Sequence, residues 1–184
     1  MPVPGCTLSV WIQPPTAFIK LGGRAAAESA RDFKALVNRL YTEGTLSFCL
    51  DLSNCLLMDS TFSGVVAGLA QSFGPEPVVG CKRFTLVNPN ARVRDLLDNL
   101  GVLDLVHVLE GEPVIRPDGT VEEVVRVGAD RKEMTACCLE AHRLLMALKP
   151  ENQAKFQEVA KGAEQNCLIS KALSIPITSE ATLV

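Results

Sequence analysis

The stretch from Leu46 to Phe73 constrains the fold most, because its hydrophobic pattern changes there from that of a strand to that of a helix. Large apolar residues alternate with small ones up to Asp51, which predicts a buried strand that delivers a carboxylate at its C-terminal end. From Asp59 onward the apolar residues recur at helical spacing and form one stripe that must face a core. This stripe consists of Phe62, Val65, Val66, Leu69 and Phe73.

The opposite face of that helix carries mostly small side chains, so another surface can approach it closely. It consists of Ser60, Gly64, Ala67 and Gln71. Asp59 is a typical helix N-cap with Ser60 in the first turn, and many helices begin this way without any function. The preceding strand and the small-residue face together favour a functional site at Asp59 and Ser60. Close packing of the helix on its own sheet explains Gly64 and Gly68 equally well.

Strands and helices alternate along the first 110 residues. Strands are expected over 8–12, 17–21, 46–51, 83–87 and 105–109, and helices over 26–40, 59–73 and 90–100. The first two strands can form a hairpin, whereas strands that are separated by helices favour parallel pairing through crossover connections. We therefore predict an α/β fold with a small mixed β-sheet of four to five strands and crossover helices.

The C-terminal third is expected to be an appendage to this domain, which covers residues 1–110. Pro113, Pro117 and Gly119 indicate a linker over 111–127. A helical extension follows over 128–165, whose first helix is amphipathic and ends at Pro150, and the tail 166–184 resists assignment. We expect the apolar stripe of this helix to pack on its own domain, with self-association into a homo-oligomer as the alternative.

Polar residues follow several of the predicted strands. In open parallel sheets, ligands and partners bind beyond the carboxyl ends of the strands. This places six residues at one candidate site, namely Asp51, Ser53, Asp59, Ser60, Asn88 and Asn90. A turn followed by a helix cap is the simpler interpretation of Asn88 and Asn90. His107 is interpreted as a structural histidine of an apolar strand.

Composition excludes several classes of function. The net charge is -3 and the basic residues are scattered, so a nucleic acid is not expected as a partner. No apolar run approaches the roughly 20 residues of a membrane span, and the first basic residue is Lys20, so we expect a cytoplasmic protein without membrane insertion. The seven cysteines show no CxxC spacing. We therefore expect buried thiols, no metal site and no cofactor.

The segment DLSNCLLMDSTFSGVVAGL, residues 51–69, resembles the STAS domain of bacterial anti-sigma factor antagonists. The order of elements extends the resemblance from about Leu8 to Glu110. In that family an Asp-Ser pair opens the helix and a partner kinase phosphorylates the serine, which implies Ser60 as the phosphoacceptor and makes Thr61 and Ser63 weaker candidates. The family commonly has Asp-Ser-Ser-Gly or Asp-Ser-Thr-Gly, whereas here the glycine is displaced to Gly64.

The resemblance implies a non-catalytic regulator that binds an anti-sigma factor or serine kinase and is released by phosphorylation. The small-residue face would dock on the partner, and a phosphate of about 1.5 to 2 negative charges on Ser60 would end that contact. Because the phosphate would lie at a helix N-terminus, the helix itself should survive. The predicted partner surface comprises Asp51, Ser53, Asp59, Ser60, Gly64, Ala67, Gln71, Asn88 and Asn90.

Three other functions are alternatives to this one. A STAS domain can instead be a non-switching subunit of a signalling or transport assembly. A receiver-type domain phosphorylated on Asp51 is less favoured, because the segment after the first strand offers no acidic pair for magnesium. An enzyme with Cys49 or Cys55 as nucleophile lacks a local motif that would activate the thiol.

Overall fold

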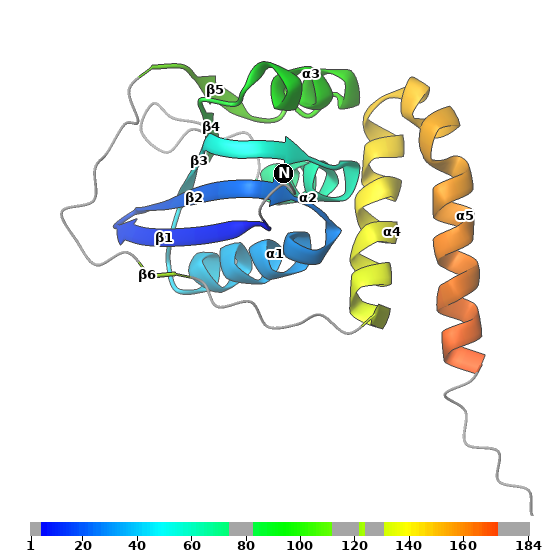
Figure 1. The fold of residues 1–184 in the computed structure, drawn as a ribbon. Coiled ribbons are helices and arrows are strands. Elements are labelled where there is room, and N and C mark those ends of the chain that lie inside the picture. The colour runs from blue at the N-terminus through cyan, green and yellow to red at the C-terminus, as the bar shows by residue number, and fades with distance from the viewer. Residues whose placement is uncertain (1–4, 74–82, 112–121, 124–130, 173–184) are drawn as a thin grey trace, which may run out of the picture.

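The structure is a computed structural model that describes residues 5–73, 83–111, 122–123 and 131–172. One six-stranded sheet has the order β5-β4-β3-β2-β1-β6 (Figure 1). Its strands are β1 Thr7–Gln13, β2 Thr16–Ala25, β3 Ser47–Met58, β4 Phe84–Val87, β5 His107–Leu109 and β6 Glu122–Glu123. β1 pairs antiparallel with β2 and β6, and β2 to β5 pair in parallel. The α/β class with a mixed sheet is confirmed, and the two-residue β6 adds a strand within the predicted linker.

Five helices accompany the sheet in the described part of the chain. They are α1 Ala27–Thr42, α2 Ser60–Ser72, α3 Ala91–Leu100, α4 Arg131–Leu148 and α5 Pro150–Ala172. The predicted boundaries of α3 are confirmed by its caps. The Asn90 side chain accepts a hydrogen bond from the Val93 N–H, and Gly101 ends the helix at a φ of 80°, a conformation that glycine adopts without steric cost.

The expected end of the third strand at Asp51 is wrong. β3 continues to Met58, because β2 is long enough to pair with it from Thr16↔Ser47 to Ala25↔Met58. The shorter β4 stops earlier, and its last pair with β3 is Val87↔Asp51. Asp51 therefore lies inside a strand, at the point where one of the two neighbouring strands ends.

Aromatic side chains from α1, α2 and the sheet form the centre of the core. Phe33 of α1 stacks on Phe62 of α2 with ring centroids 5.0 Å apart, and Phe48 of β3 lies 5.9 Å from Phe84 of β4. All five residues of the predicted α2 stripe are buried. The stripe thus fixes the rotation of α2 about its axis, which in turn decides where Ser60 and Gly64 point.

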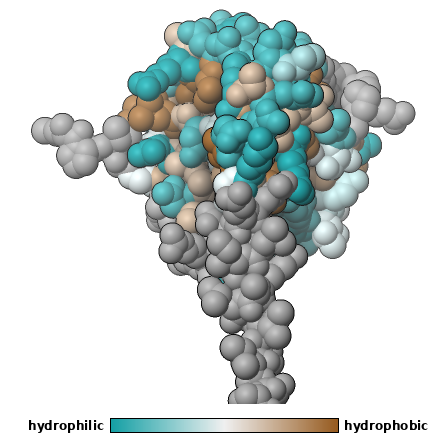
Figure 2. Space-filling model, turned by 90° about the vertical axis from the view of Figure 1, so that its right-hand side faces the viewer, coloured by the Kyte–Doolittle hydropathy of each residue, from teal (hydrophilic) through white to brown (hydrophobic). Residues whose placement is uncertain are grey.

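α4 and α5 form a helical pair on one side of the fold, with α5 outermost (Figure 1). Cys137, Ala141 and Leu145 of α4 join the same hydrophobic core as the sheet, so the expected packing of this stripe on its own domain is confirmed. α5 runs to Ala172, past the predicted end of the extension. Seen from this side, the described surface is mostly hydrophilic with a smaller apolar area (Figure 2). Self-association through these helices stays a prediction.

None of the helices in the described ranges combines the length and apolar character that a bilayer crossing requires.

Candidate functional site

Asp59 connects two helix starts at the end of β3. Its Oδ1 accepts a hydrogen bond from the Phe62 N–H and its Oδ2 accepts one from the Ala27 N–H, both at 2.9 Å. Its own N–H donates to the Ala25 carbonyl. One carboxylate therefore caps α2 and holds the start of α1 beside it, and each bond satisfies a backbone donor that a helix leaves unpaired. The predicted N-cap is confirmed, and this arrangement fixes the position of the next residue, Ser60.

Ser60 is half-buried, and its hydroxyl lies against a histidine of α4. The Ser60 Oγ and the His142 Nε2 are 2.8 Å apart, and the His142 Nδ1 lies 3.4 Å from the Cys138 Sγ. The imidazole also stacks on Phe156 of α5 at 4.8 Å. Burial lowers the pKa of His142, an effect that the nearby Asp59 carboxylate opposes. The neutral ring is thus the form that this environment favours, and a neutral ring can accept the Ser60 proton in a hydrogen bond.

The two weaker phosphoacceptor candidates lie deeper than Ser60. Thr61 is 4% exposed and donates to the Cys138 Sγ, whereas Ser63 is fully buried and donates to the Asp59 carbonyl at 2.8 Å. Both hydroxyls already take part in interactions that hold the helix and its neighbours. Of the three hydroxyls in the first turn of α2, Ser60 is therefore the most accessible to a modifying enzyme.

The small-residue face of α2 is covered by α4, so the expectation that this face is open to a partner does not hold in this conformation. A Cβ atom at Gly64 would lie 2.6 Å from the carbonyl oxygen of Ala141 and 2.8 Å from its Cβ. Gly68 faces Leu144 in the same way, at 3.3 Å. Ala67 is fully buried, and only Gln71 of the predicted face is exposed. The glycines serve close packing on α4 instead of on the sheet.

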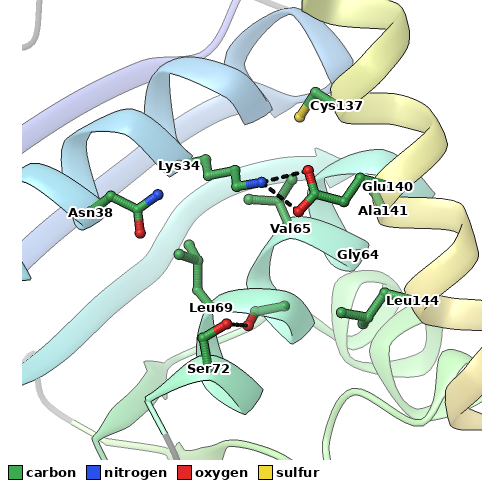
Figure 3. A pocket seen from close by; sticks show the side chains of 11 residues that line it. Lys34, Asn38, Gly64, Val65, Leu69, Ser72, Cys137, Glu140, Ala141 and Leu144 are labelled. Atoms are coloured by element: carbon green, nitrogen blue, oxygen red, sulfur yellow. Dashed lines mark hydrogen bonds and ion pairs between the residues drawn. The ribbon is translucent and has the colours of Figure 1, made fainter.

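A hollow of about 210 Å³ remains where α1, α2 and α4 meet (Figure 3). An ion pair crosses the rim of this hollow. The Lys34 ammonium of α1 contacts both carboxylate oxygens of Glu140 on α4, at 2.6 and 2.7 Å. A second ion pair joins Arg31 of α1 to Glu133 of α4 at 2.9 Å. α4 is thus held by polar contacts along one edge and by apolar contacts beneath.

The other predicted site residues form a separate group near the middle of β3. Asp51 is buried and its Oδ1 accepts hydrogen bonds from the N–H and the hydroxyl of Ser53. Asn88 donates weakly to the Ser53 hydroxyl at 3.5 Å and to the Gly111 carbonyl at 2.8 Å. Asn90 donates to the Cys55 carbonyl at 2.6 Å. Asn88 and Asn90 thus hold the segment between β4 and α3 against β3.

The predicted convergence of this group with the start of α2 is not observed. Among the described residues, the hydrogen bonds of Asp51 and Ser53 share no partner with those of Asp59 and Ser60. At about 3.3 Å per residue, the six positions from Ser53 to Asp59 span roughly 20 Å. The expected convergence depends on a strand that ends at Asp51, whereas β3 continues to Met58 and separates the two groups.

The comparisons with known proteins agree with the resemblance seen in residues 51–69. No family model matches the chain. A curated protein of Staphylococcus epidermidis, named anti-sigma-B factor antagonist, is 27% identical over 96 residues, which are 52% of this chain and 85% of that protein. The resemblance to the anti-sigma factor antagonists is confirmed. It covers about half of this chain and most of the antagonist.

Solved structures of the same class of protein are also similar. The anti-sigma factor antagonist SpoIIAA in its unphosphorylated form matches 57% of this chain and 88% of its own, with a TM-score of 0.47 and 20% identity. The Bacillus cell fate determinant SpoIIAA in its phosphorylated form matches 57% of this chain and 91% of its own, with a TM-score of 0.44 and 18% identity.

His142 is a site residue that local sequence patterns do not identify. It lies four residues after Cys138 and one after Ala141, on the buried side of the α4 stripe. The helical spacing therefore indicated that it faces the domain, and this was the one available signal. Nothing in the sequence pairs it with Ser60, which is 82 positions away.

The cysteines near the site are poorly suited to nucleophilic chemistry. Burial, followed by the neighbouring Cys6, raises the pKa of Cys55 to about 11. Burial also raises the pKa of Cys137. Since the thiolate is the reactive form, these two thiols are held in the unreactive state at neutral pH. In the described ranges, no group of three or more His, Cys, Asp or Glu side chains could hold a metal ion.

Proposed function

We propose that this protein is a non-catalytic regulator that binds an anti-sigma factor with serine kinase activity and is switched by phosphorylation of Ser60. The name of the curated relative, an anti-sigma-B factor antagonist, supports the partner class. The single observation that carries the switch is the position of Ser60 in the first turn of a helix whose cap, Asp59, is fully engaged in hydrogen bonds.

A phosphate at this position would change the surface and leave the fold intact. The first turn of a helix tolerates negative charge through its unpaired N–H groups and its dipole. Asp59 and Ser60 would then present more than two negative charges side by side. A partner that packs closely on this end of α2 would have to desolvate those charges without compensation. Release of the partner follows.

The partner surface that we propose is centred on Ser60 and Gly64 and continues along α2 to Ala67 and Gln71, and a partner reaches it only when α4 moves off this face. Asp51, Ser53, Asn88 and Asn90 are a second contact region beside β3, whose Ser53 lies six strand positions, roughly 20 Å, from Asp59. Interfaces of standard size bury about 800 Å² on each partner, which is enough to include both regions.

A non-switching role in a signalling or transport assembly is the second candidate. This role is favoured by the position of α4, which covers Ser60 and Gly64. A permanent partner can bind elsewhere on the exposed surface and needs no access to Ser60. Under this alternative, Ser60 is a structural residue that anchors α4.

The receiver-type and cysteine-nucleophile alternatives lose support. Asp51 is buried, lies inside β3 and already accepts two hydrogen bonds from Ser53. A receiver-type aspartate must instead be open to magnesium and to a phosphodonor. The raised pKa of Cys55 argues against thiolate chemistry at that position.

Phosphosite mapping tests the proposal. The full chain is incubated with ATP and the purified anti-sigma factor kinase of its source organism, and the modified residue is located by mass spectrometry. We expect phosphate on Ser60 in the wild type and none in Ser60→Ala. Ser72→Ala is the matched control, because Ser72 is an exposed hydroxyl at the other end of the same helix. Equal phosphate incorporation by Ser60→Ala would contradict the proposal.

A further inference from the structure

α4 lies on the face of α2 that the proposed function assigns to the partner. We define this covered face as Ser60, Gly64 and Gly68, which are spaced by four residues and so lie on one side of the helix. Each of them contacts a different part of α4: His142, the backbone of Ala141, and Leu144. The contact at Gly64 is so close that no side chain fits between the two helices.

The contacts of α4 are those expected of one helix that docks on another protein. Small residues meet at the crossing point, apolar side chains flank it, and charged pairs lie at the rim, as at Lys34 with Glu140 (Figure 3). Rim ion pairs between exposed side chains contribute little to stability. Glu140 has a side chain that is 66% exposed. α4 is therefore held mainly by apolar side chains, among them Cys137, Ala141 and Leu145, and by the hydrogen bond between Ser60 and His142.

We infer that α4 occupies the partner's binding site on α2. It covers Ser60 and Gly64 until it moves off this face and a helix of the partner binds there instead. This inference rests on the proposed function for the identity of the face. It specifies the partner chemistry as a helix with a small residue opposite Gly64 and an acidic group within reach of Lys34. The covered state neither binds the partner nor presents Ser60 to a kinase.

The position of α4 directly affects whether the Ser60 hydroxyl can be phosphorylated. In the covered state the hydroxyl is engaged with His142 at 2.8 Å, and the ring occupies the space next to it. A kinase must surround the acceptor hydroxyl with its own catalytic groups and ATP. His142 and the rest of α4 must therefore leave before phosphoryl transfer to the Ser60 Oγ can occur.

The opening of α4 can be measured without any partner. Cys137 is a buried thiol of α4, and Cys55 is a buried thiol of the sheet. The wild-type full chain is treated with N-ethylmaleimide under native conditions, and the labelling rate of each thiol is read by peptide mass spectrometry. If α4 opens while the sheet stays folded, Cys137 is labelled at least about 10-fold faster than Cys55. Equal rates would show that α4 leaves only on global unfolding, which would overturn the inference.

A reversible cross-link tests whether the opening controls Ser60. The Thr61 Oγ1 lies 3.4 Å from the Cys138 Sγ, so Thr61→Cys places two thiols in position for a disulfide between α2 and α4. The oxidised chain should lose phosphorylation of Ser60 by at least about 10-fold and regain it on reduction. Thr61→Cys with Cys138→Ala is the matched control, since it cannot form this bond.

The outcomes separate the inference from the proposed function. Equal phosphorylation of the oxidised and reduced chains would overturn the inference while leaving the proposed function in place. No phosphorylation of Ser60 in any form, including the wild type, would contradict the proposed function. In that case the ratio of the Cys137 and Cys55 labelling rates still decides whether α4 is a removable cover.

Discussion

Gly64→Ala is the substitution that most directly probes the contact between α2 and α4. The added Cβ would lie 2.6 Å from the Ala141 carbonyl oxygen, 2.8 Å from the Ala141 Cβ and 2.9 Å from the Ala141 carbonyl carbon. Two of these three atoms belong to the backbone, so no side-chain rotation relieves the overlap. α4 must move as a whole, or its contact with α2 must break.

The expected magnitude follows from two opposing effects. Overpacking of a close contact costs about 1 to 3 kcal/mol, whereas replacing a mid-helix glycine by alanine contributes about 1 kcal/mol through helix propensity. Gly68→Ala is the matched control. Its Cβ would meet only the flexible end of Leu144, at 3.3 Å. The propensity effect is common to both variants, so the difference between them isolates the steric cost of about 1 to 3 kcal/mol.

Urea denaturation of the two full-length variants and the wild type provides the assay, with the free energy of unfolding taken from the midpoint and slope. We expect Gly64→Ala to be less stable than the wild type, and Gly68→Ala to be equal to it or up to about 1 kcal/mol more stable. Equal stability of the two variants would refute the close packing of α4 at Gly64, and with it the cover over this face.

Other contacts of the site lead to further predictions. Asp59→Ala removes both hydrogen bonds of the double cap and should lower the free energy of unfolding by about 1 to 3 kcal/mol, measured by urea denaturation. Asn152→Ala should cost a similar amount, about 1 to 3 kcal/mol, because its buried amide donates to carbonyls at the ends of α3 and α4. Lys34→Ala and Glu140→Ala should each change stability by less than about 1 kcal/mol, since the pair is near the surface. Burial lowers the pKa of His142 from its ordinary 6.5, so on acidification the unfolded chain binds a proton before the folded chain does. The free energy of unfolding should therefore fall as the pH drops from 7 through 6.5 toward the lowered pKa. Urea denaturation at several pH values should show that His142→Gln flattens this fall.

Features that depend on local spacing were predictable from the sequence. The caps at Asp59, Asn90 and Gly101 and the buried stripe of α2 follow from residue types within four positions of one another, and all of them are observed. Such patterns fix where a helix begins and which side of it is buried. They also made Ser60 a candidate before any fold was known.

Features that depend on distant partners were not predictable. The length of β3 past Asp51 is set by its pairing with β2, which is long enough to reach Met58. Gly64 is covered by Ala141, which is distant in the sequence, so no residue near Gly64 indicates this contact. A small-residue face indicates that something packs closely, and the sequence alone does not say whether that is the chain itself or a partner.

The affinity of the purified anti-sigma factor for the full chain, measured by isothermal titration calorimetry before and after stoichiometric phosphorylation of Ser60, tests the central claim most directly. Uncompensated like charges in an interface cost several kcal/mol, and each 1.4 kcal/mol is about tenfold in affinity. We predict that the phosphorylated chain binds at least about 100-fold more weakly than the unmodified chain. Equal dissociation constants for the two forms would contradict the proposed switch at Ser60.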